Sequence, residues 1–173
     1  MHTKSTFAKY VPIIGVMGSG KPGPFDSLAY ELGKALAAAG YMVLTGGGGG
    51  IMSAVSRGAA EAGGTVIGIL PSSGPDDPLY GGYYPNPYVT IPIYTGMSDA
   101  RNVINVKSSD VVVALPGEAG TLSEVALALK NGKPVILLKW SELKLPFDCR
   151  QLVSYVEDVP GVLNMIKQIL EKR

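Results

Sequence analysis

Apolar residues along the chain form short continuous runs that end at glycine, proline or a polar residue. Runs of this length, rich in valine, isoleucine and leucine, are typical of strands that are buried on both faces of a parallel sheet. The pattern predicts strands within residues 11–18, 41–47, 64–71, 88–96, 110–117, 134–140 and 152–158.

Between these runs, apolar residues recur at the three- and four-residue spacing of an amphipathic helix. In the first such segment Leu28, Leu32 and Leu36 share one face, and Asp26 or Ser27 can cap the start. Further helices are predicted within residues 51–63, 98–106, 121–130 and 158–170. This alternation indicates one α/β domain over residues 1–173, a Rossmann-like, doubly wound, mostly parallel sheet with helices on both faces.

The composition of the chain argues against nucleic acid and membranes as partners. The 173 residues are 46% hydrophobic, which is enough for one well-filled core. The 15 basic and 14 acidic residues give a net charge of +1 and form no basic block, so we expect no nucleic-acid partner. No apolar run approaches the roughly 20 residues of a membrane span, so we expect no membrane association and a cytoplasmic location.

The scarcity of histidine and cysteine excludes several kinds of catalytic site. His2 is the single histidine and Cys149 the single cysteine. Ser-His-Asp and Cys-His catalysis need an imidazole in the site, and a zinc site needs a cluster of such ligands. We therefore expect no zinc site, and any chemistry must use arginine, lysine, carboxylates, hydroxyls and backbone amides. For the enzyme considered below we expect neither a bound metal nor an organic cofactor.

The turn GVMGSGKPG, residues 15–23, resembles two nucleotide-binding motifs without completing either. It departs from the P-loop at Pro22, where a serine or threonine should bind Mg²⁺. It contains G-x-G-x-x-G, but the next strand does not end in the acidic residue that holds the ribose hydroxyls in dinucleotide folds. We interpret Gly18 and Ser19 as a wall of a ligand pocket; a tight turn with no ligand is the alternative.

A better anion cradle is LPGEAGTLSE, residues 115–124. Its glycines allow a tight turn with converging backbone N–H groups, and the helix expected to begin at Thr121 points its positive dipole end the same way. We predict that a phosphate binds at this turn, which consists of Gly117, Glu118, Ala119, Gly120 and Thr121.

Several segments occur in the order and at the spacing found in the Lonely Guy family. They are TGGGGGIM, GTVIGILP, Arg101 and SSDVVVALPGEAGTLSE. The chain resembles this family, whose members also carry the misleading label of possible lysine decarboxylases. The resemblance implies a Rossmann-like fold, assembly at least as a dimer, and hydrolysis of a cytokinin riboside 5′-monophosphate to the free base and ribose 5-phosphate. It does not imply decarboxylation of lysine.

Two positions depart from the family's motifs. Asn102 stands where the family has a lysine after the arginine, and Glu118 stands where it has the second glycine of Pro-Gly-Gly. The stretch TGMSDARNVINVKSSD is similar to a smaller sister group that includes the molybdenum cofactor carrier protein of algae, in which Arg-Asn is usual. The positions that match the family are Arg101, Pro116, Gly117, Gly120, Thr121 and Glu124.

The resemblance implies catalytic roles for Arg101 and Glu124. A carboxylate near the sugar would stabilise the positive charge that develops on the ribosyl ring, and an arginine would bind phosphate or the departing base. Structural roles are the alternatives, because Thr121 and Glu124 also fit a capping box and Arg101 could be a solvated helix residue. Further residues expected in the pocket are Gly18, Ser19, Gly47, Gly48, Gly49, Met97 and Asn102.

Three further features have two interpretations each. The glycines at 46–50 indicate either close approach of another group or a flexible turn. Glu118 either occupies the anion position itself or points away from it. The tyrosine-rich connection at 72–88 either stacks on a base or contacts a second subunit, and we favour the subunit contact.

These observations leave two functions of different classes. We expect an enzyme of phosphoribohydrolase type that acts on a nucleoside 5′-monophosphate. The competing hypothesis is a non-catalytic carrier of a phosphorylated ligand such as the molybdenum cofactor. In both cases the partner is a small phosphorylated ligand and the protein is a homodimer or a higher homo-oligomer. A dinucleotide-binding oxidoreductase is disfavoured, because the acidic residue after the second strand is missing.

Overall fold

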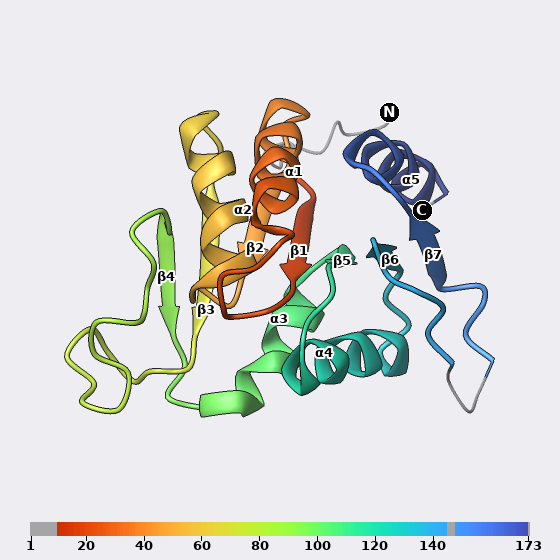
Figure 1. Ribbon diagram of the computed structural model, residues 1–173. Helices are drawn as coiled ribbons and strands as arrows, with labels where there is room; N and C mark the ends of the chain where they lie inside the picture. Colours follow the sequence, from red (N-terminus) through yellow and green to blue (C-terminus); the bar gives the residue numbers. More distant parts are fainter. Residues whose placement is uncertain (1–9, 145–147, 173) are drawn as a thin grey trace, which may run out of the picture.

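A parallel β-sheet runs through the middle of the protein (Figure 1). The computed structural model describes residues 10–144 and 148–172. The strands within these residues are β1 (Ile13–Met17), β2 (Met42–Thr45), β3 (Val66–Leu70), β4 (Ile91–Tyr94), β5 (Val111–Ala114), β6 (Val135–Leu138) and β7 (Val153–Val156). They lie in the order β4-β3-β2-β1-β5-β6-β7, and every neighbouring pair is parallel.

Helices cover both faces of the sheet (Figure 1). They are α1 (Asp26–Ala38), α2 (Gly50–Glu61), the 3-10 turn η1 (Ser98–Arg101), α3 (Asn102–Ser108), α4 (Ala119–Lys130) and α5 (Val159–Glu171). One buried cluster contains Leu32 of α1, Val55 of α2 and Ile166 of α5. A second cluster contains Val106 of α3 and Val125 of α4. The two clusters form the two halves of the core.

The central strand β5 shows why a continuous apolar run predicts a sheet that is covered on both faces. Val111 and Val113 belong to the cluster with α1, α2 and α5, whereas Val112 and Ala114 belong to the cluster with α3 and α4. Successive side chains of a strand point to opposite faces, so both faces of β5 are buried and every position has to be apolar.

The predicted fold class is confirmed, and the sheet is parallel throughout. From β1 the chain continues through β2 and β3 to β4 on one side, and then returns to place β5 on the other side of β1. The order of strands therefore reverses at β1 and β5, which is where ligands bind in doubly wound folds. No described helix is long and apolar enough to cross a membrane.

Three helix starts differ from the predictions. Helix α1 begins at Asp26 with Phe25 as its N-cap residue, so neither Asp26 nor Ser27 caps it. The segment expected to be helical from Ser98 begins as η1 and becomes α-helical at Asn102. Helix α4 begins at Ala119 and not at Thr121, because Glu118 has the extended backbone of an N-cap residue.

Candidate functional site

The turns that follow β1, β2 and β5 meet at one edge of the sheet, because the carboxyl ends of parallel strands point the same way. The turn after β1 contacts the start of α2, where the backbone N–H of Ile51 donates to the Ser19 oxygen at 3.0 Å. It also lies against the turn before α4, since a Cβ added to Gly117 would be 3.0 Å from the Ser19 nitrogen. A cavity of about 150 Å³, the strand-edge pocket, is lined mainly by the turn after β1, the segment from Asp99 to Asn102 and the start of α4.

The strand-edge pocket brings together most of the residues that the sequence motifs predicted. The predicted residues that line it are Gly18, Ser19, Arg101, Asn102, Glu118, Gly120, Thr121 and Glu124. Gly20, Met52 and Asp99 also line it and were not predicted. Of the other expected residues, Gly117 lies in the turn before α4 and Ala119 is the first residue of α4, and neither lines the pocket. Met97 does not line it either and is 42% exposed.

The glycines at 46–50 are crowded by the protein itself. A Cβ added to any of these glycines would come too close to another part of the protein. The neighbour is Arg101 at Gly46, Leu70 at Gly47, Tyr84 at Gly48, Gly20 at Gly49 and Lys21 at Gly50. Close approach is therefore the correct interpretation of this segment, and a merely flexible turn is excluded. Gly47, Gly48 and Gly49 are not among the described residues that line the strand-edge pocket.

Arg101 is buried, with 8% of its surface exposed, so the interpretation as a solvated helix residue was wrong. Its Nη1 atom donates to the backbone oxygens of Gly46 at 2.7 Å and Ile69 at 2.6 Å. The guanidinium carbon lies 5.6 Å from the ring centre of Tyr84, which comes from the connection at 72–88. The Nε atom has no hydrogen-bond partner among the described residues. Arg101 thus joins the ends of β2 and β3 and places a positive charge in the pocket.

Glu124 is also buried, with 8% of its surface exposed. Loss of hydration raises the pKa of its carboxyl group to about 7, while a hydrogen bond from Asn105 and the charge of Arg101 act in the opposite direction. The capping-box interpretation was wrong: Thr121 lies inside α4, the N-cap residue is Glu118, and the Glu124 side chain turns to Asn105. The carboxyl group is therefore available in both protonation states near neutral pH.

Asn105 does not line the pocket but contacts its residue Glu124, and the sequence analysis did not identify it. It is fully buried, and its Nδ2 atom donates to Glu124 Oε1 at 2.7 Å. It follows Arg101 by four residues, a spacing that places two side chains on one helical face. That spacing was the available signal, but it does not distinguish a site residue from an ordinary buried amide.

Glu118 extends across the mouth of the site to the turn after β1. Its Oε1 atom lies 2.9 Å from Lys21 Nζ, and the two side chains are 70% and 77% exposed. The Glu118 side chain makes no capping hydrogen bond to α4. The carboxylate thus does not bind the start of its own helix; it pairs with a lysine and stays largely exposed to solvent.

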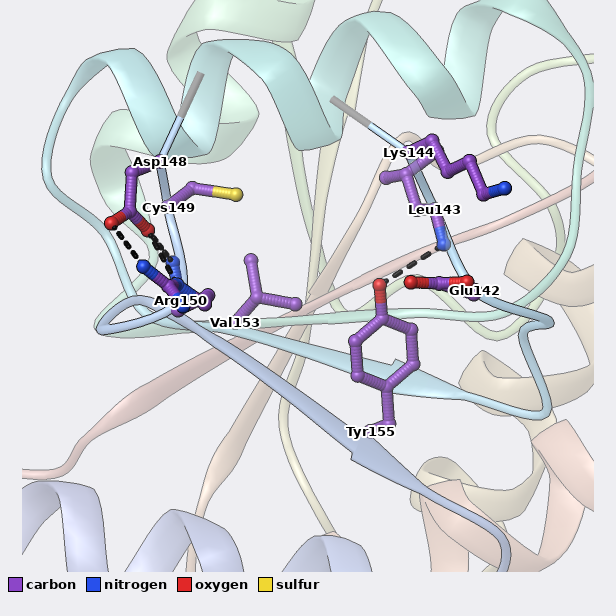
Figure 2. A pocket seen from close by; sticks show the side chains of 8 residues that line it. All are labelled: Glu142, Leu143, Lys144, Asp148, Cys149, Arg150, Val153 and Tyr155. Carbon is purple, nitrogen blue, oxygen red and sulfur yellow. Dashed lines mark hydrogen bonds and ion pairs between the residues drawn. The ribbon is translucent and has the colours of Figure 1, made fainter. Parts of the chain in front are cut away.

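A larger cavity of about 690 Å³ lies between strand β7 and the segments before it (Figure 2). There the backbone N–H of Leu143 donates to the Tyr155 hydroxyl at 3.0 Å, and Arg150 pairs with Asp148 at 2.9 Å. None of its described lining residues belongs to the predicted motifs. The strand-edge pocket is therefore the candidate functional site.

Known proteins resemble this chain in sequence and in fold. The model of the SLOG cluster4 family matches residues 11–161. The chain belongs to this family. The molybdenum cofactor binding protein of Rippkaea orientalis is 41% identical to this SLOG cluster4 protein, with a TM-score of 0.81 over 94% of this chain and 99% of the other. The molybdenum cofactor carrier protein of Chlamydomonas reinhardtii is 40% identical, with a TM-score of 0.76 over 92% and 99% of the two chains.

Enzymes of the Lonely Guy type are more distant relatives of this SLOG cluster4 protein. A cytokinin riboside 5′-monophosphate phosphoribohydrolase of Arabidopsis thaliana is 32% identical over 142 residues, which are 78% of this chain and 60% of that enzyme. The chain thus spans less than two thirds of the enzyme's length. The resemblance to the Lonely Guy family, and to the sister group with the carrier protein, is confirmed.

Proposed function

We propose that the protein binds a nucleoside 5′-monophosphate in the strand-edge pocket and hydrolyses its N-glycosidic bond. The observation that carries the proposal is the buried Glu124 carboxyl group, whose pKa of about 7 suits it to acid and base chemistry near neutral pH. It shares the pocket with the exposed glycine turn at the start of α4. Relatives named as phosphoribohydrolases support the same reaction.

The phosphate belongs at the turn from Gly117 to Thr121. The first backbone N–H groups of a helix have no partner within the helix, and the helix dipole adds positive potential there. In α4 these groups receive no capping hydrogen bond from the Glu118 side chain, and Gly117, Ala119 and Gly120 are exposed. An anion would therefore satisfy donors that are otherwise hydrated.

The hydrolysis breaks the bond between C1′ of the ribose and a nitrogen of the base. The bonding electron pair goes to the base, which takes up a proton, while a water oxygen bonds to C1′ and loses a proton. Ionised Glu124 stabilises the positive charge that develops on the ribosyl ring and accepts the proton of the water. Arg101 Nη1 is held by two backbone oxygens, so its contribution is a fixed charge that favours the ionised form of Glu124.

A carrier function is the second proposal, and the solved structures favour it. The Rippkaea orientalis and Chlamydomonas reinhardtii proteins are named for binding or carrying the molybdenum cofactor, and they align with nearly the whole chain. A carrier would hold the phosphate of its ligand at the same turn before α4 without turnover. Under this proposal Glu124 contacts the ligand or its hydration shell without transferring protons.

We also propose that the protein forms a homodimer or a larger homo-oligomer. Ile91 and Ile93 of edge strand β4 are exposed, as are Leu79 and Tyr83 of the connection before it and Met97 after it. Exposed large apolar residues become buried when they lie in a subunit contact. Light scattering during size-exclusion chromatography measures the mass directly, and a monomer at micromolar concentration would refute the proposal.

The enzymatic proposal is tested with AMP and the variant Glu124→Gln. We expect the wild-type protein to release free adenine, and the variant to lose about 100-fold or more in turnover while AMP affinity changes less than threefold, because the carboxylate acts mainly in the transition state. Chromatography measures adenine, and calorimetry measures AMP binding. Glu157→Gln, at an exposed ion pair outside the pocket, is the control.

The outcomes separate the two proposals. Equal turnover by the wild-type protein and Glu124→Gln would assign Glu124 a structural role. Absence of adenine, together with a phosphorylated ligand found by native mass spectrometry of the purified protein, would support the carrier function instead.

A further inference from the structure

The ion pair between Lys21 and Glu118 joins the two glycine turns that form the pocket. Lys21 belongs to the turn after β1 and Glu118 to the turn before α4. Both residues line a second cavity of about 320 Å³, which shares Ser19 and Glu118 with the strand-edge pocket. The pair therefore lies at the junction of the two cavities, beside the turn where the phosphate is placed.

The backbone beneath the pair is fixed, whereas the two charged side chains are not. The Lys21 backbone N–H donates to Ser19 Oγ at 3.1 Å, and a Cβ on Gly50 would lie 2.5 Å from the Lys21 oxygen. By contrast, the side chains of Lys21 and Glu118 are 77% and 70% exposed. Exposed ion pairs of this kind contribute little stability, so the ammonium can exchange one anionic partner for another.

The charges around the strand-edge pocket do not favour a phosphate as they stand. Three carboxyl groups line it, those of Asp99, Glu118 and Glu124. Among its described lining residues, Arg101 is the one basic side chain, and Arg101 Nη1 already binds two backbone oxygens. A dianionic phosphate beside Glu118 needs a further cation, and the Lys21 ammonium lies 2.9 Å from that carboxylate.

We propose that Lys21 is an anion-binding residue of the site. Without a ligand its ammonium group pairs with the Glu118 carboxylate, and a bound phosphate replaces that carboxylate as the partner of Lys21. When phosphate binds at the start of α4, Lys21 turns from Glu118 to the phosphate and the carboxylate moves into solvent. Glu118 thus acts as an internal competitor that lowers the affinity for any anion at this turn. The inference rests on the proposed function only in taking the ligand to be phosphorylated.

Inorganic phosphate is the probe, because it needs no recognition of a base. Its binding is followed by the backbone amide NMR signals of Ser19, Gly120 and Thr121. We expect Glu118→Gln to tighten phosphate binding by about threefold to tenfold, since the variant removes both the competitor and a nearby like charge. Lys21→Met should weaken binding by about the same factor. Glu157→Gln, which breaks the exposed pair with Lys139, should leave the affinity unchanged.

The double variant separates competition for Lys21 from simple repulsion. If Glu118 competes for the ammonium, Glu118→Gln gains less affinity in a Lys21→Met background than in the wild-type protein. Equal gains in both backgrounds would overturn the proposal, and so would unchanged affinity in Glu118→Gln or the absence of phosphate-dependent shifts in every variant. The AMP assay is independent, so a protein that binds phosphate as expected but leaves AMP intact refutes the enzymatic proposal alone.

Discussion

Glu124 lies in surroundings that act on its ionisation in opposite directions. Burial raises the pKa of the carboxyl group, and this effect exceeds the lowering by the Asn105 hydrogen bond and the Arg101 charge. With a pKa of about 7, both protonation states are populated near neutral pH. At neutral pH the same carboxyl group in water would be almost fully ionised. The burial of this one side chain is therefore what allows it to act as both acid and base near pH 7.

Replacing Asn105 by alanine should raise the pKa of Glu124 further. The variant removes a hydrogen bond that favours the ionised carboxylate, while the other surroundings remain. NMR titration of the Glu124 side-chain carboxyl carbon measures the change in pKa. The acidic limb of the pH profile of adenine release should shift to higher pH by the same amount. Asn131→Ala is the control, because Asn131 is exposed and bonds to the backbone of Leu127.

A pKa of Glu124 that stays unchanged or falls in Asn105→Ala would contradict this assignment. Loss of the buried amide should also destabilise the fold by about 1–3 kcal/mol. Stability alone therefore does not test the positioning role of Asn105, whereas the titration does.

The sequence motifs predict that Arg101 and Glu124 lie in the pocket, but they do not predict the hydrogen-bond partners of these two residues. T-x-x-E at 121–124 has the pattern of a capping box, and the sequence does not show that the helix already begins at Ala119. Asn105 looks like any buried amide until α3 and α4 are placed side by side. Local patterns therefore identify which residues have unusual chemistry, while tertiary packing decides what each one contacts.

At the scale of elements, the glycine turns set how closely strands, helices and loops approach one another. Gly50, at the start of α2, has a φ of +54° and lies against the backbone oxygens of Ser19 and Lys21. The sequence indicates that some group approaches residues 46–50 closely, because ordering five successive glycines costs much backbone entropy. It does not indicate whether that group is a ligand or the turn after β1.

Gly50→Ala should therefore destabilise the protein by about 2 kcal/mol or more, through backbone strain and collision with the turn after β1. Chemical denaturation measures the loss. Gly74→Ala is the matched control, because a Cβ at Gly74 meets nothing within 4 Å and its backbone is not left-handed. A change below about 0.5 kcal/mol in Gly50→Ala, similar to the control, would show that the turns are not packed as described.

At the scale of the whole molecule, the parallel topology assembles the site from distant parts of the chain. Lys21 and Glu118 are 97 residues apart in sequence, yet their turns follow the adjacent strands β1 and β5. The repeated alternation of strands and helices predicts that such turns share one edge of the sheet. Strand order follows from long-range pairing, so the contact between these particular turns could be identified only in the folded structure.

The buried carboxyl group also makes the stability of the whole molecule depend on pH. In the unfolded chain Glu124 titrates near its ordinary pKa of 4.5, and in the folded protein near 7. Below pH 4.5 the group is protonated in both states and burial is not penalised. As the pH rises toward 7, the unfolded state releases its proton first, so the free energy of unfolding falls, by roughly 3 kcal/mol in all.

Glu124→Gln should abolish this contribution, because glutamine is neutral at every pH. The free energy of unfolding of the variant minus that of the wild-type protein should therefore increase between pH 4.5 and 7 and be constant above about pH 7.5. Denaturation at a series of pH values measures both proteins, and taking the difference cancels the titration of all other groups. A difference that does not change with pH would mean that Glu124 ionises alike in the folded and unfolded protein. Its burial would then not raise its pKa, and the basis for proton transfer at neutral pH would be lost.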